Sequence, residues 1–262
     1  MSENVILVTG ATGLLGREVL ERVRHAGVPV RAMTRKTDLP DDPGVRWVTA
    51  DLQTGTDVAE ALEGVTTVIH CASDTRKPKH DIPGWRHLID AAREAGVRHI
   101  VNISIVGVDR TTYPYYKIKL EGELMLAESG IPWTNLRATQ FPDLLDAVFR
   151  FMMRLPFVLV PSKTPCQPVD QGEVADRLVE LALGAPAGQV AEMGGPKVYD
   201  AKELARTWLA AAGRKRPILP IHLPGTVGAV FRSGALTTPE HAVGVRTWEE
   251  FLAGKVADRA TR

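Results

Sequence analysis

Cysteine and a recognisable leader are the two features that this 262-residue sequence most clearly lacks. It has only two cysteines, Cys71 and Cys166, too few for the disulfide framework of a small secreted domain. The N-terminus shows no charged and then apolar segment, so we expect no export and place the protein in the reducing cytoplasm. A chain of this length can bury a sizeable hydrophobic core without disulfide bonds.

Charge of one sign and long apolar runs are also missing. The formal net charge is +1, which gives no broad field for nucleic acid or an anionic membrane. The most apolar stretch, residues 144–160, contains three charged residues and a proline, namely Asp146, Arg150, Arg154 and Pro156. These exclude a membrane span. We expect an amphipathic helix followed by a turn, and neither a nucleic-acid nor a membrane partner.

Short β-branched runs alternate with helical segments from residue 4 to about residue 141. Six runs are apolar enough to be strands buried on both faces: residues 5–9, 30–33, 45–49, 67–71, 99–104 and 134–137. This alternation is typical of a parallel sheet covered by helices. The sequence therefore predicts an α/β fold, a Rossmann-type doubly wound parallel sheet, in residues 1–141.

The predicted helices have recognisable ends, and the pattern changes after residue 141. Helices are expected at residues 16–25, 85–94 and 115–128, each followed by a glycine suited to a C-terminal cap. Prolines then become frequent, so we place a small substrate-side region in residues 142–262, packed on the same domain. It is expected to contain helices at residues 173–183 and 202–212, and packed irregular structure at 217–239.

A glycine-rich loop joins the first predicted strand to the first helix, with the sequence TGATGLLG at residues 9–16. In a dinucleotide fingerprint the first glycine permits a tight turn, the second lets the backbone approach the pyrophosphate, and the third lets helix and strand pack closely. Amides at the helix start then face the phosphates. We therefore expect a bound dinucleotide, although any α/β protein can contain such a turn. The expected contacts are Gly10, Thr12, Gly13, Leu14, Leu15 and Gly16.

Two basic residues, Arg35 and Lys36, follow the second predicted strand. At this position an NAD-binding protein holds the ribose hydroxyls with Asp or Glu. A carboxylate would repel the 2′-phosphate of NADP, whereas a guanidinium can bind it with two hydrogen bonds. The pair therefore favours NADP (NADPH) as the cofactor, with a solvated basic loop as the alternative.

Asp51 and Leu52 follow the third predicted strand. The carboxylate could accept a hydrogen bond from the adenine amino group while the leucine flanks the ring. An ordinary turn aspartate explains Asp51 equally well. Both interpretations stay open at this point.

Taken together, these residues resemble the short-chain dehydrogenase/reductase superfamily, in particular its atypical, NmrA-like group. The resemblance covers roughly the first 140 residues and rests on TGATGLLG, Arg35, Asp51-Leu52, the strand end at residues 70–73, Ser104, YYKIKLEGE at 115–123 and LRATQF at 136–141. It implies cofactor contacts below the adenine ribose and beside the nicotinamide carboxamide, and no metal. These contacts are Cys71, Ala72, Ser73, Ala138, Thr139, Gln140 and Phe141.

The superfamily uses a Tyr-x-x-x-Lys pair, and this sequence offers two overlapping copies. They are Tyr113 with Lys117 and Tyr115 with Lys119. Spacing of four places both side chains on one helix face. Pro114 suits the first turn of a helix and leaves the residue before it outside. This favours Tyr115 and Lys119 without excluding the other copy.

The resemblance implies distinct roles for three side chains. Tyr115 would donate or accept the proton of the reaction, although a free tyrosine has a pKa of about 10. We expect Lys119, together with the oxidised nicotinamide ring, to lower that pKa, and the same lysine to bind the nicotinamide ribose. Ser104 would orient the substrate carbonyl, or be a strand-end serine without a proton role. Some apolar residues could line a substrate cavity or belong to the core: Trp133, Phe149, Phe151, Met152, Met153 and Phe157.

These patterns predict an NADP(H)-dependent oxidoreductase that transfers hydride to or from a small apolar carbonyl, enone or quinone-type substrate. One alternative is a non-catalytic, NADP-binding redox sensor or regulator of NmrA-like type. Another is a nucleotide-dependent epimerase or isomerase. The sequence leaves a monomer and a homodimer equally open.

Overall fold

The computed structural model describes residues 4–39, 42, 44–74 and 77–260. The chain forms two compact, interleaved units. The first unit comprises Met1–Ser104, Pro114–Leu136 and Gln171–Val190, and the second comprises Ile105–Tyr113, Arg137–Asp170 and Ala191–Arg262. The expected boundary at residue 141 falls just beyond the sixth strand, but the chain later returns to the first unit with one more helix and strand.

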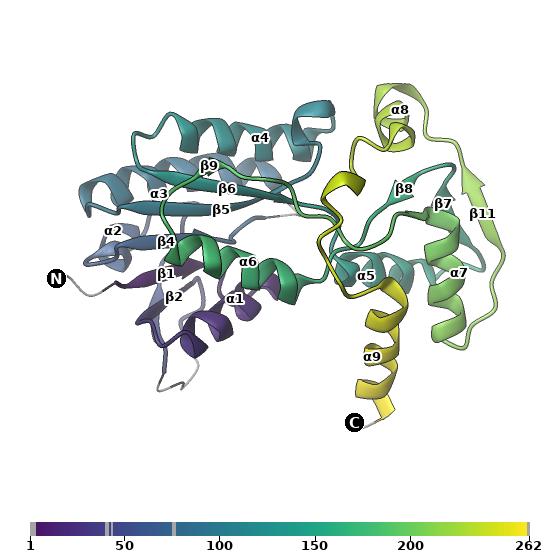
Figure 1. Ribbon diagram of the computed structural model, residues 1–262, viewed down its shortest axis with the longest axis horizontal. Coiled ribbons are helices and arrows are strands. Elements are labelled where there is room, and N and C mark those ends of the chain that lie inside the picture. The colour runs from purple at the N-terminus through teal and green to yellow at the C-terminus, as the bar shows by residue number, and fades with distance from the viewer. Residues whose placement is uncertain (1–3, 40–41, 43, 75–76, 261–262) are drawn as a thin grey trace. The chain divides into compact units, whose positions relative to one another are not determined.

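A seven-stranded parallel sheet is the centre of the first unit, in the order β3-β2-β1-β4-β5-β6-β9 (Figure 1). The strands are β1 Ile6–Thr9, β2 Val30–Thr34, β3 Arg46–Thr49, β4 Thr67–His70, β5 His99–Ile105, β6 Trp133–Ala138 and β9 Gly188–Gln189. The predicted α/β class and all six predicted strands are confirmed. One expectation is wrong: β3 is partly exposed because it is the edge strand.

The strand order reverses at β1, which pairs with β2 on one side and β4 on the other. In open α/β sheets, ligands bind in the crevice beyond the carboxyl ends of the strands at such a switch point. The topology therefore places a binding crevice beside Thr9 and His70, the last residues of β1 and β4.

Helices cover both faces of this sheet, with α1 packed against α6 on one face and α3 packed against α4 on the other (Figure 1). Their bounds are α1 Leu14–His25, α2 Val58–Leu62, α3 Asp81–Glu94, α4 Pro114–Ala127 and α6 Gln171–Leu183. Buried side chains from β1, β4 and β5 meet Trp85 and Leu88 of α3 in one apolar core. This core fixes the strand ends at which the crevice opens.

The second unit holds two small sheets and four α-helices within the described residues. Its elements are α5 Pro142–Met152, β7 Val158–Pro161, β8 Pro165–Cys166, β10 Tyr199–Asp200, α7 Ala201–Ala211, β11 Ile218–Ile221, α8 Gly225–Ser233 and α9 Trp248–Ala260. β7 pairs with β11 in parallel, and β8 with β10 in antiparallel fashion. The irregular structure expected at residues 217–239 is a partial error, because β11 and α8 lie there.

An aromatic cluster forms the core of the second unit. The Phe149 ring centroid lies 5.8 Å from that of Trp208 and 6.3 Å from that of Trp248. Asp146, which is buried, accepts hydrogen bonds of 2.7 Å from Trp208 Nε1 and from Arg150 Nε. Phe149 is thus a core residue, whereas Phe151 is 62% exposed.

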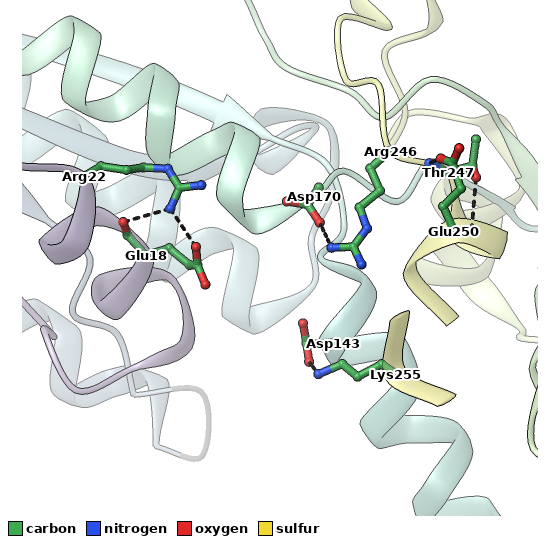
Figure 2. A network of polar contacts seen from close by, with 8 residues as sticks. All are labelled: Glu18, Arg22, Asp143, Asp170, Arg246, Thr247, Glu250 and Lys255. Atoms are coloured by element: carbon green, nitrogen blue, oxygen red, sulfur yellow. Dashed lines mark hydrogen bonds and ion pairs between the residues drawn. The ribbon is translucent and has the colours of Figure 1, made fainter. Parts of the chain in front are cut away.

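Three further polar contacts bind the C-terminal segment of this unit (Figure 2). Arg246 Nη1 lies 2.9 Å from Asp170, Lys255 Nζ lies 2.7 Å from Asp143, and the Thr247 hydroxyl donates to Glu250 at 2.9 Å. The pair with Asp143 joins α9 to α5. Across the described part of the chain, none of the helices is both long and apolar enough to traverse a bilayer.

Candidate active site

A cleft of about 570 Å³ lies in the first unit at the carboxyl ends of the central strands. It brings together the predicted cofactor residues Gly10, Thr12, Gly13, Arg35, Lys36, Asp51, Leu52, Cys71, Ala72 and Ser73. The loop after β1 thus faces the basic pair after β2 across one cavity. The other predicted cofactor contacts do not line it: Leu14 is exposed, Leu15, Gly16 and Lys119 are buried, and the segment from Ala138 to Phe141 lies elsewhere in the chain.

Two glycines of the loop pack so closely against the backbone of other residues that a side chain would not fit. Gly10 has a φ of +64°, and a Cβ there would lie 2.8 Å from Ala72 Cα. A Cβ on Gly16 would lie 2.1 Å from the carbonyl oxygen of Gly10. Gly13 is the N-cap of α1, and no side chain of a described residue caps this helix. Its first amides are therefore oriented as an anion-binding terminus.

The basic pair is exposed at the rim of this cleft, and its backbone is held in place. The Lys36 amide donates to Thr34 Oγ1 at 3.2 Å, and the Thr49 hydroxyl donates to the Lys36 carbonyl at 3.0 Å. Neither Arg35 nor Lys36 forms a salt bridge with another described residue. Both cations are thus available to an anionic ligand.

Asp51 is a turn aspartate that also lines the cleft. Its Oδ1 accepts the Gln53 amide at 2.9 Å, and its own amide donates to the Thr56 carbonyl at 3.0 Å. Leu52 is half-buried beside it, with its carbonyl 2.7 Å from His87 Nδ1. Asp51 is therefore a turn residue, as one interpretation expected. Because it also lines the cleft, its contact with the adenine stays a prediction.

The end of β4 is packed and uncharged. Thr9 Oγ1 lies 2.9 Å from His70 Nδ1, and the His70 ring centroid lies 4.2 Å from that of Trp85. Burial lowers the pKa of His70 to about 3 and raises the pKa of the Cys71 thiol to about 12. A neutral imidazole and a protonated thiol position the strand end and perform no acid-base or nucleophilic chemistry at neutral pH.

The Tyr-x-x-x-Lys helix, α4, begins at Pro114, so Tyr113 lies outside it. Tyr115 is half-buried, with its hydroxyl oxygen 3.4 Å from Ser73 Oγ. Lys119 is buried and its Nζ donates to the Ile103 carbonyl at 3.1 Å. Pro114 thus begins the helix as expected, and the choice of Tyr115 and Lys119 as the working pair stays a prediction.

For the protein without a nucleotide, the pKa of Tyr115 is raised, and the expected lowering by Lys119 together with the nicotinamide ring stays a prediction. Burial raises the pKa of Tyr115, the Ser73 hydrogen bond opposes this shift, and the Asp81 carboxylate adds to it. Burial also lowers the pKa of Lys119 against the attraction of nearby acidic groups, Asp81 first. Burial is thus the largest cause of the raised pKa of Tyr115, while the Lys119 ammonium donates to the Ile103 carbonyl.

Ser104, the penultimate residue of β5, is buried, and its hydroxyl has no hydrogen-bond partner among the described residues. It follows Ile103, whose carbonyl accepts the Lys119 ammonium. An unpaired buried hydroxyl costs free energy. A bound molecule that reached this hydroxyl would supply the missing hydrogen bond.

Asp81 is a candidate site residue that the sequence reasoning missed. It is the first residue of α3 and lines the cleft. Its Oδ2 accepts the Ser73 hydroxyl at 2.7 Å, and its Oδ1 accepts the Asp74 amide at 2.8 Å. An acidic residue near a helix start was the available signal, but the helix was expected to begin only at Trp85.

The predicted nicotinamide-side segment, Ala138 to Phe141, belongs to the second unit. Gln140 Nε2 donates to the Leu236 carbonyl at 2.8 Å, and its Oε1 accepts the Gln167 amide at 2.9 Å. The Thr139 hydroxyl donates to the Gln167 carbonyl. These bonds stabilise the second unit, and the cofactor contact of this segment stays a prediction.

Known proteins are similar to this chain in sequence or in fold. The (4-alkanoyl-5-oxo-2,5-dihydrofuran-3-yl)methyl phosphate reductase of Streptomyces griseus is 34% identical over 144 residues, 52% of this chain and 48% of its own length. Photosystem II assembly factor Ycf39 of Trieres chinensis is 27% identical over 241 residues, 86% of this chain and 75% of its own. The chain thus spans about half of the reductase and three quarters of the assembly factor.

A solved structure matches over nearly the whole chain. The NADPH-dependent quinone oxidoreductase QOR2 of Escherichia coli, complexed with NADPH, superposes with a TM-score of 0.77 at 21% identity, covering 95% of this chain and 99% of its own. At this identity the match shows a common fold. Residues 10–149, which include the glycine loop, the basic pair and α4, match the family described as NAD(P)H-binding. This confirms the resemblance drawn from the sequence, and the chain belongs to the NAD(P)H-binding family.

Proposed function

We propose that this protein is an NADP(H)-dependent oxidoreductase that reduces, or in reverse forms, a small apolar carbonyl, enone or quinone-type compound. The observation that carries the proposal is one cleft lined by both the glycine loop and the cations Arg35 and Lys36, which form no salt bridge with other described residues. A nucleotide with an additional phosphate fits this charge pattern. Reduction is also the activity for which the similar Streptomyces reductase and quinone oxidoreductase are named.

The residues present fit such a cofactor. Gly10 packs against the backbone of Ala72 and Gly16 against that of Gly10, which holds the loop closely, and the start of α1 offers its amides to a pyrophosphate. Arg35 and Lys36 would hold the 2′-phosphate, and Leu52 would flank the adenine. When bound, NADPH supplies the hydride.

Proton transfer falls to α4 and β5. Tyr115 is the proposed proton donor in reduction, because its raised pKa keeps the phenol protonated at neutral pH. Lys119 lies one helical turn away on the same helix and is held by the Ile103 carbonyl. The Ser104 hydroxyl, which has no hydrogen-bond partner among the described residues, would donate a hydrogen bond to the substrate oxygen.

The test is NADPH oxidation with a panel of ketones, enones and quinones. We expect turnover of at least one class by the wild-type protein. Tyr115→Phe should lower kcat by about a hundredfold or more. Tyr113→Phe is the matched control, since Tyr113 is exposed and outside α4, and should retain full activity. Equal rates for the wild type and Tyr115→Phe would refute the assigned proton donor.

A second candidate is a protein that binds NADPH without turning it over. It is favoured by the match to the photosystem II assembly factor, which covers more of this chain than the match to the reductase. Tight NADPH binding with no oxidation on any member of the panel would support this candidate over the enzyme.

A further inference from the structure

Tyr115, Ser73 and Asp81 form a line of hydrogen-bonding groups within the first unit. Tyr115 Oη lies 3.4 Å from Ser73 Oγ, and the Ser73 hydroxyl donates to Asp81 Oδ2 at 2.7 Å. The three side chains come from α4, the end of β4 and the start of α3. A hydroxyl that accepts on one side and donates on the other can pass a proton between a phenol and a carboxylate.

We propose that Ser73 and Asp81 form a proton relay that returns a proton to Tyr115 after each reduction. This inference rests on the proposed function, because it needs Tyr115 as the proton donor. It assigns roles to two residues that do not themselves react with the substrate. Both are therefore positioning and relay residues.

The proton balance is simple. Reduction of a carbonyl adds one hydride to carbon, supplied by NADPH, and one proton to oxygen, supplied by the Tyr115 hydroxyl. The O–H bond of Tyr115 breaks and leaves a phenolate. A proton from solvent first binds the Asp81 carboxylate. Ser73 then gives its hydroxyl proton to the phenolate and takes this proton from the Asp81 carboxyl, which returns to the carboxylate form. In the oxidation direction the same proton travels from Tyr115 to Asp81 and then to water.

The Asp81 carboxylate is the end of the proposed relay that exchanges protons with solvent, and a second hydrogen bond holds it in place. Its second oxygen accepts the Asp74 amide at 2.8 Å, which fixes its orientation. Ser73, Asp74, His80 and Asp81 all line the cleft, so solvent reaches the end of the line. The described ionisable groups that face Asp81 are Tyr115 and Lys119 from α4, and Asp74 and His80 from its own segment.

Two other ionisable groups nearby are unsuited to this role. The Lys119 ammonium is buried and donates to the Ile103 carbonyl. His70 is buried, and burial lowers its pKa to about 3, so it carries no exchangeable positive charge at neutral pH. Ser73 and Asp81 therefore remain as the hydrogen-bonded groups beside the Tyr115 hydroxyl.

The experiment compares Ser73→Ala and Asp81→Asn with the wild type at saturating NADPH. We expect kcat to fall about tenfold, a modest loss for an indirect proton-transfer group. Because reprotonation becomes slow, the solvent isotope effect on kcat should rise, and the isotope effect from deuterated NADPH should shrink. Imidazolium buffer should restore part of the rate of either variant. Ser73→Thr keeps a hydroxyl and should restore most of the rate.

Asp90→Asn is the matched control, since Asp90 is an exposed carboxylate on the same helix that pairs with Arg93. It should change neither rate nor isotope effects. If Ser73→Ala and Asp81→Asn fold but keep the wild-type isotope effects while Tyr115→Phe is inactive, the relay is overturned and the proposed function stands. If Tyr115→Phe is fully active, the proposed function fails and the relay fails with it.

Discussion

The Cα of Gly16 packs directly against the loop at Gly10, because a Cβ on Gly16 would lie 2.1 Å from the Gly10 carbonyl oxygen. Gly16→Ala should therefore force the start of α1 away from the loop. We expect a loss of about 3 kcal/mol or more in the free energy of unfolding and loss of NADPH binding. Chemical denaturation and nucleotide titration measure the two effects.

Gly184→Ala provides the control in the same unit, because a Cβ there would be 3.5 Å from the Glu180 carbonyl, an ordinary contact. It should change stability by about 0.5 kcal/mol or less. Equal effects of the two substitutions would show that the loop does not pack as described.

The raised pKa of Tyr115 sets the pH dependence of reduction. The protonated phenol is the donor, so the rate should stay constant at neutral pH and fall only as pH rises through this raised pKa. The Ser73 hydrogen bond lowers this pKa and the Asp81 charge raises it. Ser73→Ala should therefore move the alkaline limb to higher pH, and Asp81→Asn to lower pH. Shifts in the same direction would contradict this electrostatic account.

A feature could be predicted from the sequence where it depends on residues that are close together in the chain. The strands and the glycine loop depend on neighbouring residues, so the six strands and the shared cleft of the loop and Arg35 were predictable. Asp81 was not, because its importance depends on α3 starting before Pro83 and on Ser73 lying opposite.

The acceptor of the Lys119 ammonium could not be predicted from the sequence for a similar reason. Spacing of four shows that Tyr115 and Lys119 share a helix face, but not which acceptor the ammonium reaches. The Ile103 carbonyl, contributed by β5, is that acceptor. Only the tertiary structure supplies this contact, and the same holds for Gln140 and its bonds across the second unit.

Burial of His70 should make the protein acid-sensitive. Its folded pKa is about 3, below the value of about 6.5 in an unfolded chain. The unfolded state therefore binds the proton first, so stability is fully present above about pH 6.5 and is lost as pH falls toward 3. The slope from this group approaches about 1.4 kcal/mol per pH unit.

Urea denaturation across this range tests the effect of His70. His70→Gln should reduce the slope of the unfolding free energy against pH by up to about 1.4 kcal/mol per pH unit, the contribution of one proton. His25→Gln, at an exposed position at the end of α1, should leave it unchanged. An unaltered slope in His70→Gln would show that the imidazole is not buried in its neutral form.

Buried and exposed carboxylate contacts in the second unit should differ in strength. Asp146→Ala leaves the Trp208 indole N–H without its 2.7 Å partner in the core and should cost about 1–3 kcal/mol. Lys255→Ala removes the more exposed pair with Asp143 (Figure 2) and should cost about 1 kcal/mol or less. Thermal unfolding of both variants decides the order, and a larger loss for Lys255→Ala would contradict it.

The most direct test of the account is a calorimetric titration of the wild type and of Arg35→Ala with NADPH and with NADH. A charge-assisted phosphate contact is worth about 1.5–3 kcal/mol, so Arg35→Ala should weaken NADPH binding by about ten- to a hundredfold and leave NADH binding unchanged. Arg98→Ala, at an exposed position outside the cleft, should affect neither. If the wild type binds the two nucleotides equally, or if Arg35→Ala weakens both alike, the guanidinium does not hold the additional phosphate.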